Sequence, residues 1–143
     1  RNAPRRPPVA VIDTNVMISY LFGGSTVTSV IDATERDVYT PAISPSLVRE
    51  FVDTVKKPKI SRRVDIADAL LFMEEWKSFA LFVFPGEDVH VCRDEKDNQV
   101  LACALQADAD YIVTGDEDLL VLGTFRGITI LSPANFSAKV LNR

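Results

Sequence analysis

The sequence predicts an α/β protein with a mostly parallel sheet. Short apolar runs alternate along the chain with segments in which apolar residues recur every three or four positions, the pattern of strands connected by helices. The run at residues 9–12 has no polar residue, as expected of a strand buried on both faces. The length of 143 residues suits one domain. We therefore expect one domain over residues 9–143, after an extended proline-rich arm or expression remnant at residues 1–8.

The first half of the chain predicts two strands and three helices. Gly23-Gly24 separates the first two helices, and Ser25 is the expected N-cap of the second. Pro41 is expected to end the second strand. Pro45 takes the first helical position that proline favours, and the helix that it opens has an apolar stripe. These elements are expected over residues 9–12, 14–22, 25–36, 38–40 and 44–57.

The second half begins with a basic break at residues 56–63, followed by a long helix. The third strand has two candidate positions, 81–84 and 89–92. A helix, a strand, one helical turn and a last strand follow, and Ser132-Pro133 opens a short terminal helix. The expected helices and strands after the break lie over residues 64–80, 98–107, 111–113, 119–122 and 128–131.

The charge balance limits the classes of chemistry. Sixteen Lys and Arg against twenty Asp and Glu give a net charge of −4, and leaving residues 1–8 aside gives thirteen against twenty, or −7. Such a charge does not attract nucleic acid, so a polyanion must be held by a local basic patch or through metal ions. A single histidine and two cysteines exclude multi-histidine metal sites and a disulfide framework. With no disulfide framework, a reducing cytoplasm is the expected location. The longest apolar run has six residues, so we expect no membrane span.

If the protein is an enzyme, carboxylates must therefore supply its chemistry. Asp13 follows the first strand directly, and Asp116 ends the turn after the strand at 111–113. Sites in open α/β sheets form beyond the carboxyl ends of strands. Each aspartate could instead simply cap the helix that follows it.

Asp97 differs from the other acids because it lies on the apolar face of its helix. At 100° per residue it shares that face with Leu101. A carboxylate there is costly unless it is paired or bound to a cation. The alternative is a first-turn acid favoured by the helix dipole, a role that suits Asp94 better. Glu50 is an ordinary surface acid unless the fold brings it beside Asp13.

Five cations lie within eight residues of this acidic chain. Two interpretations stay open for them: a solvated loop between helices, or a contact to the backbone of RNA. They are Lys56, Lys57, Lys59, Arg62 and Arg63. Phe72 and Trp76, four residues apart on the long helix, favour a core or dimer surface over a base-stacking platform.

The residues around the acids resemble the PIN-domain family. The resemblance covers about residues 9–136, and the subgroup most similar is the VapC-like toxin components of prokaryotic toxin–antitoxin systems. The motifs are Val-Ile-Asp13-Thr14-Asn15-Val16, Glu50 on a following helix, Lys-Asp97-Asn98 at a helix start, and Val-Thr114-Gly115-Asp116-Glu117-Asp118-Leu.

The resemblance implies a single α/β/α sandwich with a sheet of about five parallel strands and acids that converge at one edge. It also implies an endoribonuclease dependent on one or two Mg²⁺ or Mn²⁺ ions. Its implied partners are RNA, a cognate antitoxin and further copies of the chain, as a homodimer or higher homo-oligomer. By motif match the catalytic, metal-binding acids are Asp13, Glu50, Asp97 and Asp116, with Asp118 and Asp94 as auxiliary acids and Asn15 and Thr114 as polar supports.

The chemistry agrees with this resemblance. Clustered carboxylates repel one another and require cations or protons, and Mg²⁺ prefers oxygen ligands. A haloacid-dehalogenase-type phosphatase would need a second acid where Asn15 stands, and a response-regulator receiver domain would need a lysine where Ser132-Pro133 follows the last strand. The remaining alternative is a PIN-like module that binds RNA or protein without cleaving it.

Overall fold

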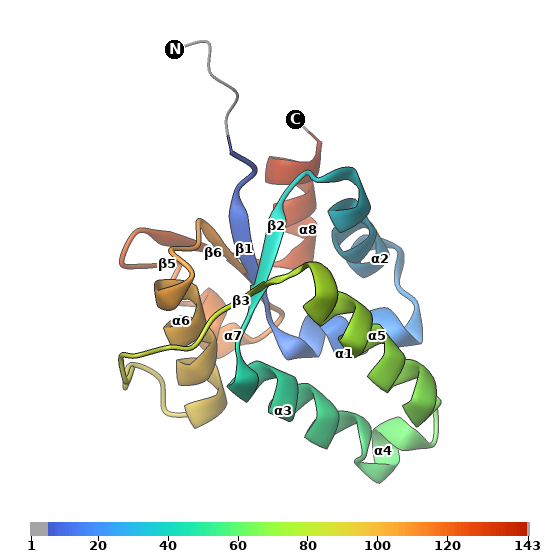
Figure 1. Cartoon of the computed structure of the whole chain (residues 1–143). Coiled ribbons are helices and arrows are strands. Elements are labelled where there is room, and N and C mark those ends of the chain that lie inside the picture. Colours follow the sequence, from blue (N-terminus) through green and yellow to red (C-terminus); the bar gives the residue numbers. More distant parts are fainter. Residues whose placement is uncertain (1–5, 143) are drawn as a thin grey trace.

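One mixed sheet forms the centre of the protein in the computed structural model, which describes residues 6–142 (Figure 1). The strand order is β3-β2-β1-β4-β6-β5, and all neighbouring pairs are parallel except β5 with β6. The strands are β1 (Val9–Ile12), β2 (Thr40–Ile43), β3 (Leu81–Phe82), β4 (Tyr111–Val113), β5 (Thr124–Phe125) and β6 (Ile128–Leu131). The predicted α/β class with a mostly parallel sheet is confirmed, with six strands in place of about five.

Helices cover both faces of the sheet. α6 (Glu95–Gln106) packs against β1, β2 and β4, and α2 (Ser25–Asp32) packs with α8 (Pro133–Phe136) on the other side (Figure 1). The remaining helical segments are α1 (Thr14–Phe22), η1 (Ala33–Arg36), α3 (Pro45–Val55), α4 (Pro58–Ser61), α5 (Ile66–Phe79), α7 (Glu117–Leu120) and η2 (Ser137–Leu141). Within residues 6–142 no single helix is long and apolar enough to cross a membrane; Thr14–Phe22 and Ser25–Arg36 meet that criterion only as a pair bent by 117°.

The sheet reverses its order of strands between β1 and β4. The chain proceeds from β1 through β2 to β3 on one side and then returns to place β4 on the other side of β1. Ile12 pairs with Val113, and the Asp13 N–H donates to the Val113 carbonyl at 2.9 Å. The loops after β1 and β4 therefore leave the same edge of the sheet, the place where open α/β sheets bind their ligands.

The second strand contains Pro41, and the prediction that Pro41 ends a strand over 38–40 is wrong. The Thr40 N–H points toward β1 and donates to the Pro8 carbonyl at 2.8 Å. Because successive strand residues point their nitrogens to opposite neighbours, residue 41 faces the β3 side. There β3 pairs only from Ala42 onward, so the donor that proline lacks costs no hydrogen bond.

Several predicted boundaries also shift. Gly24, not Ser25, is the N-cap of α2, and Ser25 is its first helical residue. α6 begins at Glu95 instead of 98, because the Asp94 side chain caps it by accepting the Lys96 N–H at 3.0 Å. α3 ends two residues before Lys57, and α7 begins two residues before 119. The predicted basic break contains the short helix α4, and residues 1–5 of the predicted N-terminal arm lie outside the described residues.

The third strand lies at Leu81–Phe82, within the first of its two candidate positions, and residues 89–92 form no strand. The sequence prediction misses β5, which forms a hairpin with β6. Its two turn residues, Arg126 and Gly127, have φ of 47° and 84°, as a type I′ turn requires. Arg-Gly is not among the common sequences of this turn, so the hairpin has little local signal.

An aromatic cluster fixes the helices beside the sheet. The Phe72 ring centroid lies 5.2 Å from that of Tyr20 on α1 and 5.9 Å from that of Phe51 on α3. Trp76, 5.8 Å from Phe72, is only 1% exposed. Phe51 and Trp76 belong to the core, and the partly buried Tyr20 and Phe72 pack against it, in agreement with the core alternative of the sequence prediction. The cluster holds α3 beside α1, which brings Glu50 next to the end of β1.

Candidate active site

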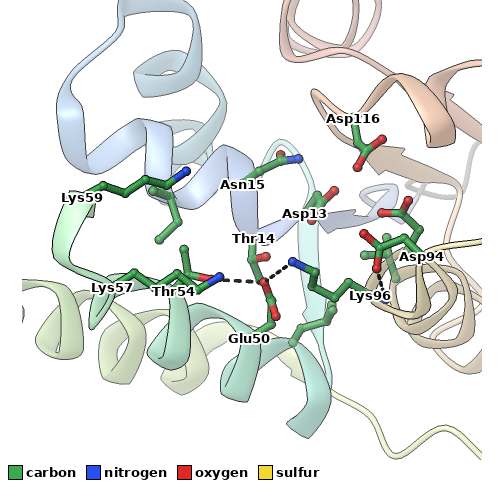
Figure 2. Close-up of a pocket in the computed structure, with 14 residues that line it drawn as sticks. Asp13, Thr14, Asn15, Glu50, Thr54, Lys57, Lys59, Asp94, Lys96 and Asp116 are labelled. Carbon is green, nitrogen blue, oxygen red and sulfur yellow. Dashed lines mark hydrogen bonds and ion pairs between the residues drawn. The ribbon is translucent and has the colours of Figure 1, made fainter. Parts of the chain in front are cut away.

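A cleft of about 290 Å³ lies at the edge where β1 and β4 end (Figure 2). Side chains from α1, α3, α4, α6 and the turn after β4 line it. The lining includes all four acids that the motif match assigns as catalytic and one of the two auxiliary acids: Asp13, Glu50, Asp97 and Asp116, with Asp94. The fold thus brings together residues from both halves of the chain.

Thr114 connects the acids that follow the two central strands. Its hydroxyl donates to Asp13 Oδ2 at 2.7 Å and accepts the Asp116 N–H at 3.0 Å. Thr114 is fully buried, and Asp13 is 6% exposed. Burial raises the pKa of Asp13, the Thr114 hydrogen bond opposes that rise, and the nearby Asp116 carboxylate adds to it. The Thr114 hydroxyl therefore connects the Asp13 carboxylate to the backbone of Asp116, and the role of polar support that the resemblance implies for it stays a prediction.

Asp97 lies in the first helical turn of α6, and its buried side chain lines the cleft. It is 4% exposed, and its Oδ2 has no hydrogen-bond partner within the described part of the chain. Burial, followed by the charges of Asp116 and Asp13, raises the pKa of Asp97 to about 7. A buried carboxylate oxygen without a donor is costly, and a bound cation would remove that cost.

Three aspartates offer a set of ligands for one cation. One carboxylate oxygen from each of Asp97, Asp116 and Asp118 lies within 4.8 Å of the others. Oxygen donors of this kind suit a hard divalent ion such as Mg²⁺ or Mn²⁺. Asp118 also forms a bidentate ion pair with Arg93, with both N···O distances 3.3 Å. Together with the unpartnered Asp97 oxygen, the donor set fits a divalent metal.

The other polar residues have local roles. Asn15 is exposed, and its Oδ1 accepts the Gly115 N–H at 3.4 Å, which connects the start of α1 to the turn after β4. The exposed Asp94 lines the cleft but uses one oxygen to cap α6. Asn15 therefore contacts the turn that leads to Asp116, and Asp94 belongs to the lining of the cleft; their implied roles as a support and an auxiliary acid stay predictions.

Glu50 lies in the same cleft but is directed to other partners. Its Oε2 accepts the Thr54 hydroxyl at 3.1 Å and lies 3.6 Å from Lys96 Nζ (Figure 2). Glu50 does not belong to the group of three aspartates that can share one ion among the described residues. The four acids that the resemblance assigns as catalytic therefore share a cleft, but only Asp97 and Asp116 among them belong to the group that can share one ion.

Only part of the basic segment at residues 56–63 lines the cleft. Lys57 and Lys59 line the cleft, at the end opposite Asp116 (Figure 2). Arg62 donates through Nε to the Pro58 carbonyl at 3.1 Å, and the Arg63 guanidinium lies 4.4 Å from the centre of the Phe22 ring. These arginines and Lys56 are not part of the cleft lining.

Sequence reasoning assigned no role to Lys96, Thr54 or the side chain of Asn98. Asn98 is 4% exposed, and its Oδ1 accepts the N–H groups of residues 91 and 92 at 3.1 and 2.7 Å, which fixes the loop leading to Asp94. An asparagine beside the apolar face of a helix was a usable signal for this role. Lys96 had none, because its approach to Glu50 depends on the packing of α3 against α6.

Comparison with known proteins covers this whole region. The family model described as PIN domain matches residues 9–118, which include every acid described above. An uncharacterized protein of Methanocaldococcus jannaschii is 31% identical over 114 residues, covering 78% of this chain and 73% of the relative.

Proposed function

The chain belongs to the PIN-domain family, whose members are generally nucleases, and on that premise we propose that it is a divalent-metal-dependent endoribonuclease. The main support is the buried, unpartnered oxygen of Asp97, in a residue that approaches Asp116 and Asp118 closely enough to share one ion. A protein with a single histidine needs such carboxylates, because a bound Mg²⁺ or Mn²⁺ activates water and neutralises charge on the phosphodiester.

The residues that line the cleft, and Asp118 close to two of them, have distinct roles in this proposal. Asp97, Asp116 and Asp118 hold the ion. Asp13 adds negative charge beside them, with its carboxylate oriented by Thr114. Thr114 also holds the Asp116 backbone, so one hydroxyl sets the relative position of two acids. Ligands held in this way need little rearrangement when the ion binds.

The proposed substrate is RNA, bound along the length of the cleft. Its phosphates need local cations, because the chain has a net charge of −4. Lys57 and Lys59 supply them at the end of the cleft opposite Asp116 (Figure 2). A strand whose scissile phosphate lies at the aspartates would place a neighbouring phosphate near these lysines.

The biological role that we propose is the toxin component of a toxin–antitoxin pair, acting in the cytoplasm as a homodimer or higher homo-oligomer with a cognate antitoxin. Its support is the resemblance of the four motifs to the VapC-like subgroup. A neighbouring reading frame that encodes a small DNA-binding protein, and relief of growth arrest when both are expressed, would support this role. Growth unaffected by the chain alone would contradict it.

Cleavage by the purified chain tests the enzymatic proposal. RNA should be cut with Mn²⁺ or Mg²⁺, and excess EDTA should abolish the reaction. Asp116→Asn, purified in parallel, controls for contaminating ribonuclease and should be inactive. Undiminished cleavage in EDTA would overturn the metal mechanism. RNA binding without cleavage under either metal would favour the non-catalytic module instead.

A further inference from the structure

Lys96 is the one lysine, of the three in the described lining of the cleft, that forms an ion pair. Its Nζ lies 3.6 Å from Glu50 Oε2. The other two, Lys57 and Lys59, line the cleft without such a pair in the described residues. Lys96 also directly precedes Asp97, so its backbone belongs to the same helical turn as a proposed metal ligand.

The position of Lys96 is unfavourable by local rules. It is the second residue of α6, and a cation in the first turn of a helix is opposed by the helix dipole. Its backbone N–H is held by the Asp94 carboxylate at 3.0 Å, which fixes where the side chain leaves the helix. The side chain then extends to α3 and pairs with Glu50 (Figure 2). The favourable interaction of the Lys96 ammonium is therefore the ion pair with Glu50 in the cleft, since the dipole of α6 opposes a cation at this position.

The pair also changes what the acids can bind. Asp97, Asp116 and Asp118 form a set that suits one ion. Glu50 is the acid that α3 contributes to the described lining of the cleft, and its Oε2 already has the Lys96 ammonium and the Thr54 hydroxyl as partners. In two-metal sites the second ion stabilises charge on the oxygens of the reacting phosphate, and an ammonium group can supply the same positive charge.

We propose that Lys96 takes the place of a second metal ion. It neutralises Glu50, so that the protein binds a single divalent ion at the three aspartates, and it directs a positive charge toward the substrate phosphate. This inference rests on the proposed function and adds to it the number of ions and a positioning residue on the side of α3.

Counting bound Mn²⁺ by electron paramagnetic resonance and calorimetry on the intact chain tests the proposal without an activity measurement. The wild type should bind one ion. Lys96→Met should bind two, because Glu50 then lacks its counter-charge. The double variant Lys96→Met/Glu50→Gln should return to one ion, and Lys96→Arg should keep one. Lys59→Met, which removes a cleft lysine without an ion pair, is the matched control and should also bind one.

Two wild-type ions, or a single ion in Lys96→Met, would overturn the inference while leaving the proposed function intact if RNA cleavage persists. A wild type that binds no Mn²⁺ and cleaves no RNA would overturn both. The Lys96 side chain is 56% exposed, so these variants should fold, and circular dichroism checks that they do.

Discussion

The acidic end of the cleft and the basic segment at residues 56–63 carry the two opposite charges that a nuclease needs. The two regions differ in burial and in how firmly the fold positions their side chains. Asp13 and Asp97 are buried, and Thr114 fixes Asp13 at the edge of the sheet. All five cations of the basic segment are exposed, and only Lys57 and Lys59 reach the cleft.

The difference follows from the cost of burial. A carboxylate taken out of water must be placed by the fold, since it is tolerated only beside a donor or a cation. A solvated lysine costs little anywhere on the surface, so nothing forces it into one position. Substitutions at the acidic end should therefore have large effects on cleavage and stability. Substitutions in the basic segment should have smaller effects on RNA binding, which depend on whether the side chain lines the cleft.

The largest expected effect is on RNA cleavage, and it should distinguish Asp97 from Asp94 at the N-terminus of α6. Asp97→Asn should lower the rate of RNA cleavage by at least about 100-fold, because a neutral amide is a poorer metal ligand. Asp94→Asn is the matched control: asparagine caps a helix as well as aspartate does, so cleavage should stay within about fivefold of the wild type. Single-turnover rates measure both. Equal losses in the two variants would place Asp94 in the site.

Loss of the Thr114 hydroxyl should have the next largest effect. Thr114→Val leaves Asp13 Oδ2 and the Asp116 N–H without this partner, so we expect a destabilisation of about 1–3 kcal/mol and about tenfold slower cleavage. Thr124→Val, on the exposed part of β5, should change stability by less than about 0.5 kcal/mol. Denaturant unfolding checks both variants. A stable, fully active Thr114→Val variant would contradict the support role.

The basic segment should respond according to which side chains face the cleft. Lys57→Ala/Lys59→Ala should weaken RNA binding and reduce the slope of log affinity against log salt by about 1–2, measured in EDTA so that no cleavage occurs. Arg62→Ala/Arg63→Ala removes the same charge outside the cleft and should leave the slope nearly unchanged. Equal changes in the two pairs would mean that the whole segment contacts RNA, as its composition alone suggests.

The smallest expected effect is on the stability of the metal-free protein. Burial and neighbouring charges raise the pKa of Asp97 to about 7, from an ordinary value of 3.8. Between these values the folded state holds a proton that the unfolded state has released, so the contribution of Asp97 to stability is lost as pH rises toward and through 7. Asn does not titrate. The quantity to measure in EDTA is the Tm of Asp97→Asn minus the Tm of the wild type. This difference should be larger at pH 8 than at pH 5, by roughly a few degrees.

The metal-free variant should be at least as stable as the wild type at pH 8, since one charge is removed from a crowded cluster. A difference in Tm that is the same at both pH values, or a variant that is less stable at pH 8, would mean that Asp97 is a dipole-favoured helix residue instead of a strained ligand.

Residues whose environment depends on local periodicity were predictable. The apolar run of β1, proline at the start of α3 and the inward position of Asp97 on α6 follow from the geometry of a single strand or helix. The resemblance of four motifs added Glu50 to the acids. The Arg126-Gly127 hairpin and the place of Pro41 in β2 could not be predicted, because the first lacks the usual turn residues and the second depends on where the neighbouring strand begins to pair.

The sequence by itself determined the class of fold, the presence of aspartates after β1 and β4, and which face of α3 and α6 is buried. Only the tertiary structure decided that β1 and β4 end side by side, that Lys96 reaches Glu50, and that two of five clustered cations face the acids. The physical reason is that helical and strand periodicity fix the direction of a side chain relative to its own element. Which directions converge depends on how elements far apart in the chain pack together.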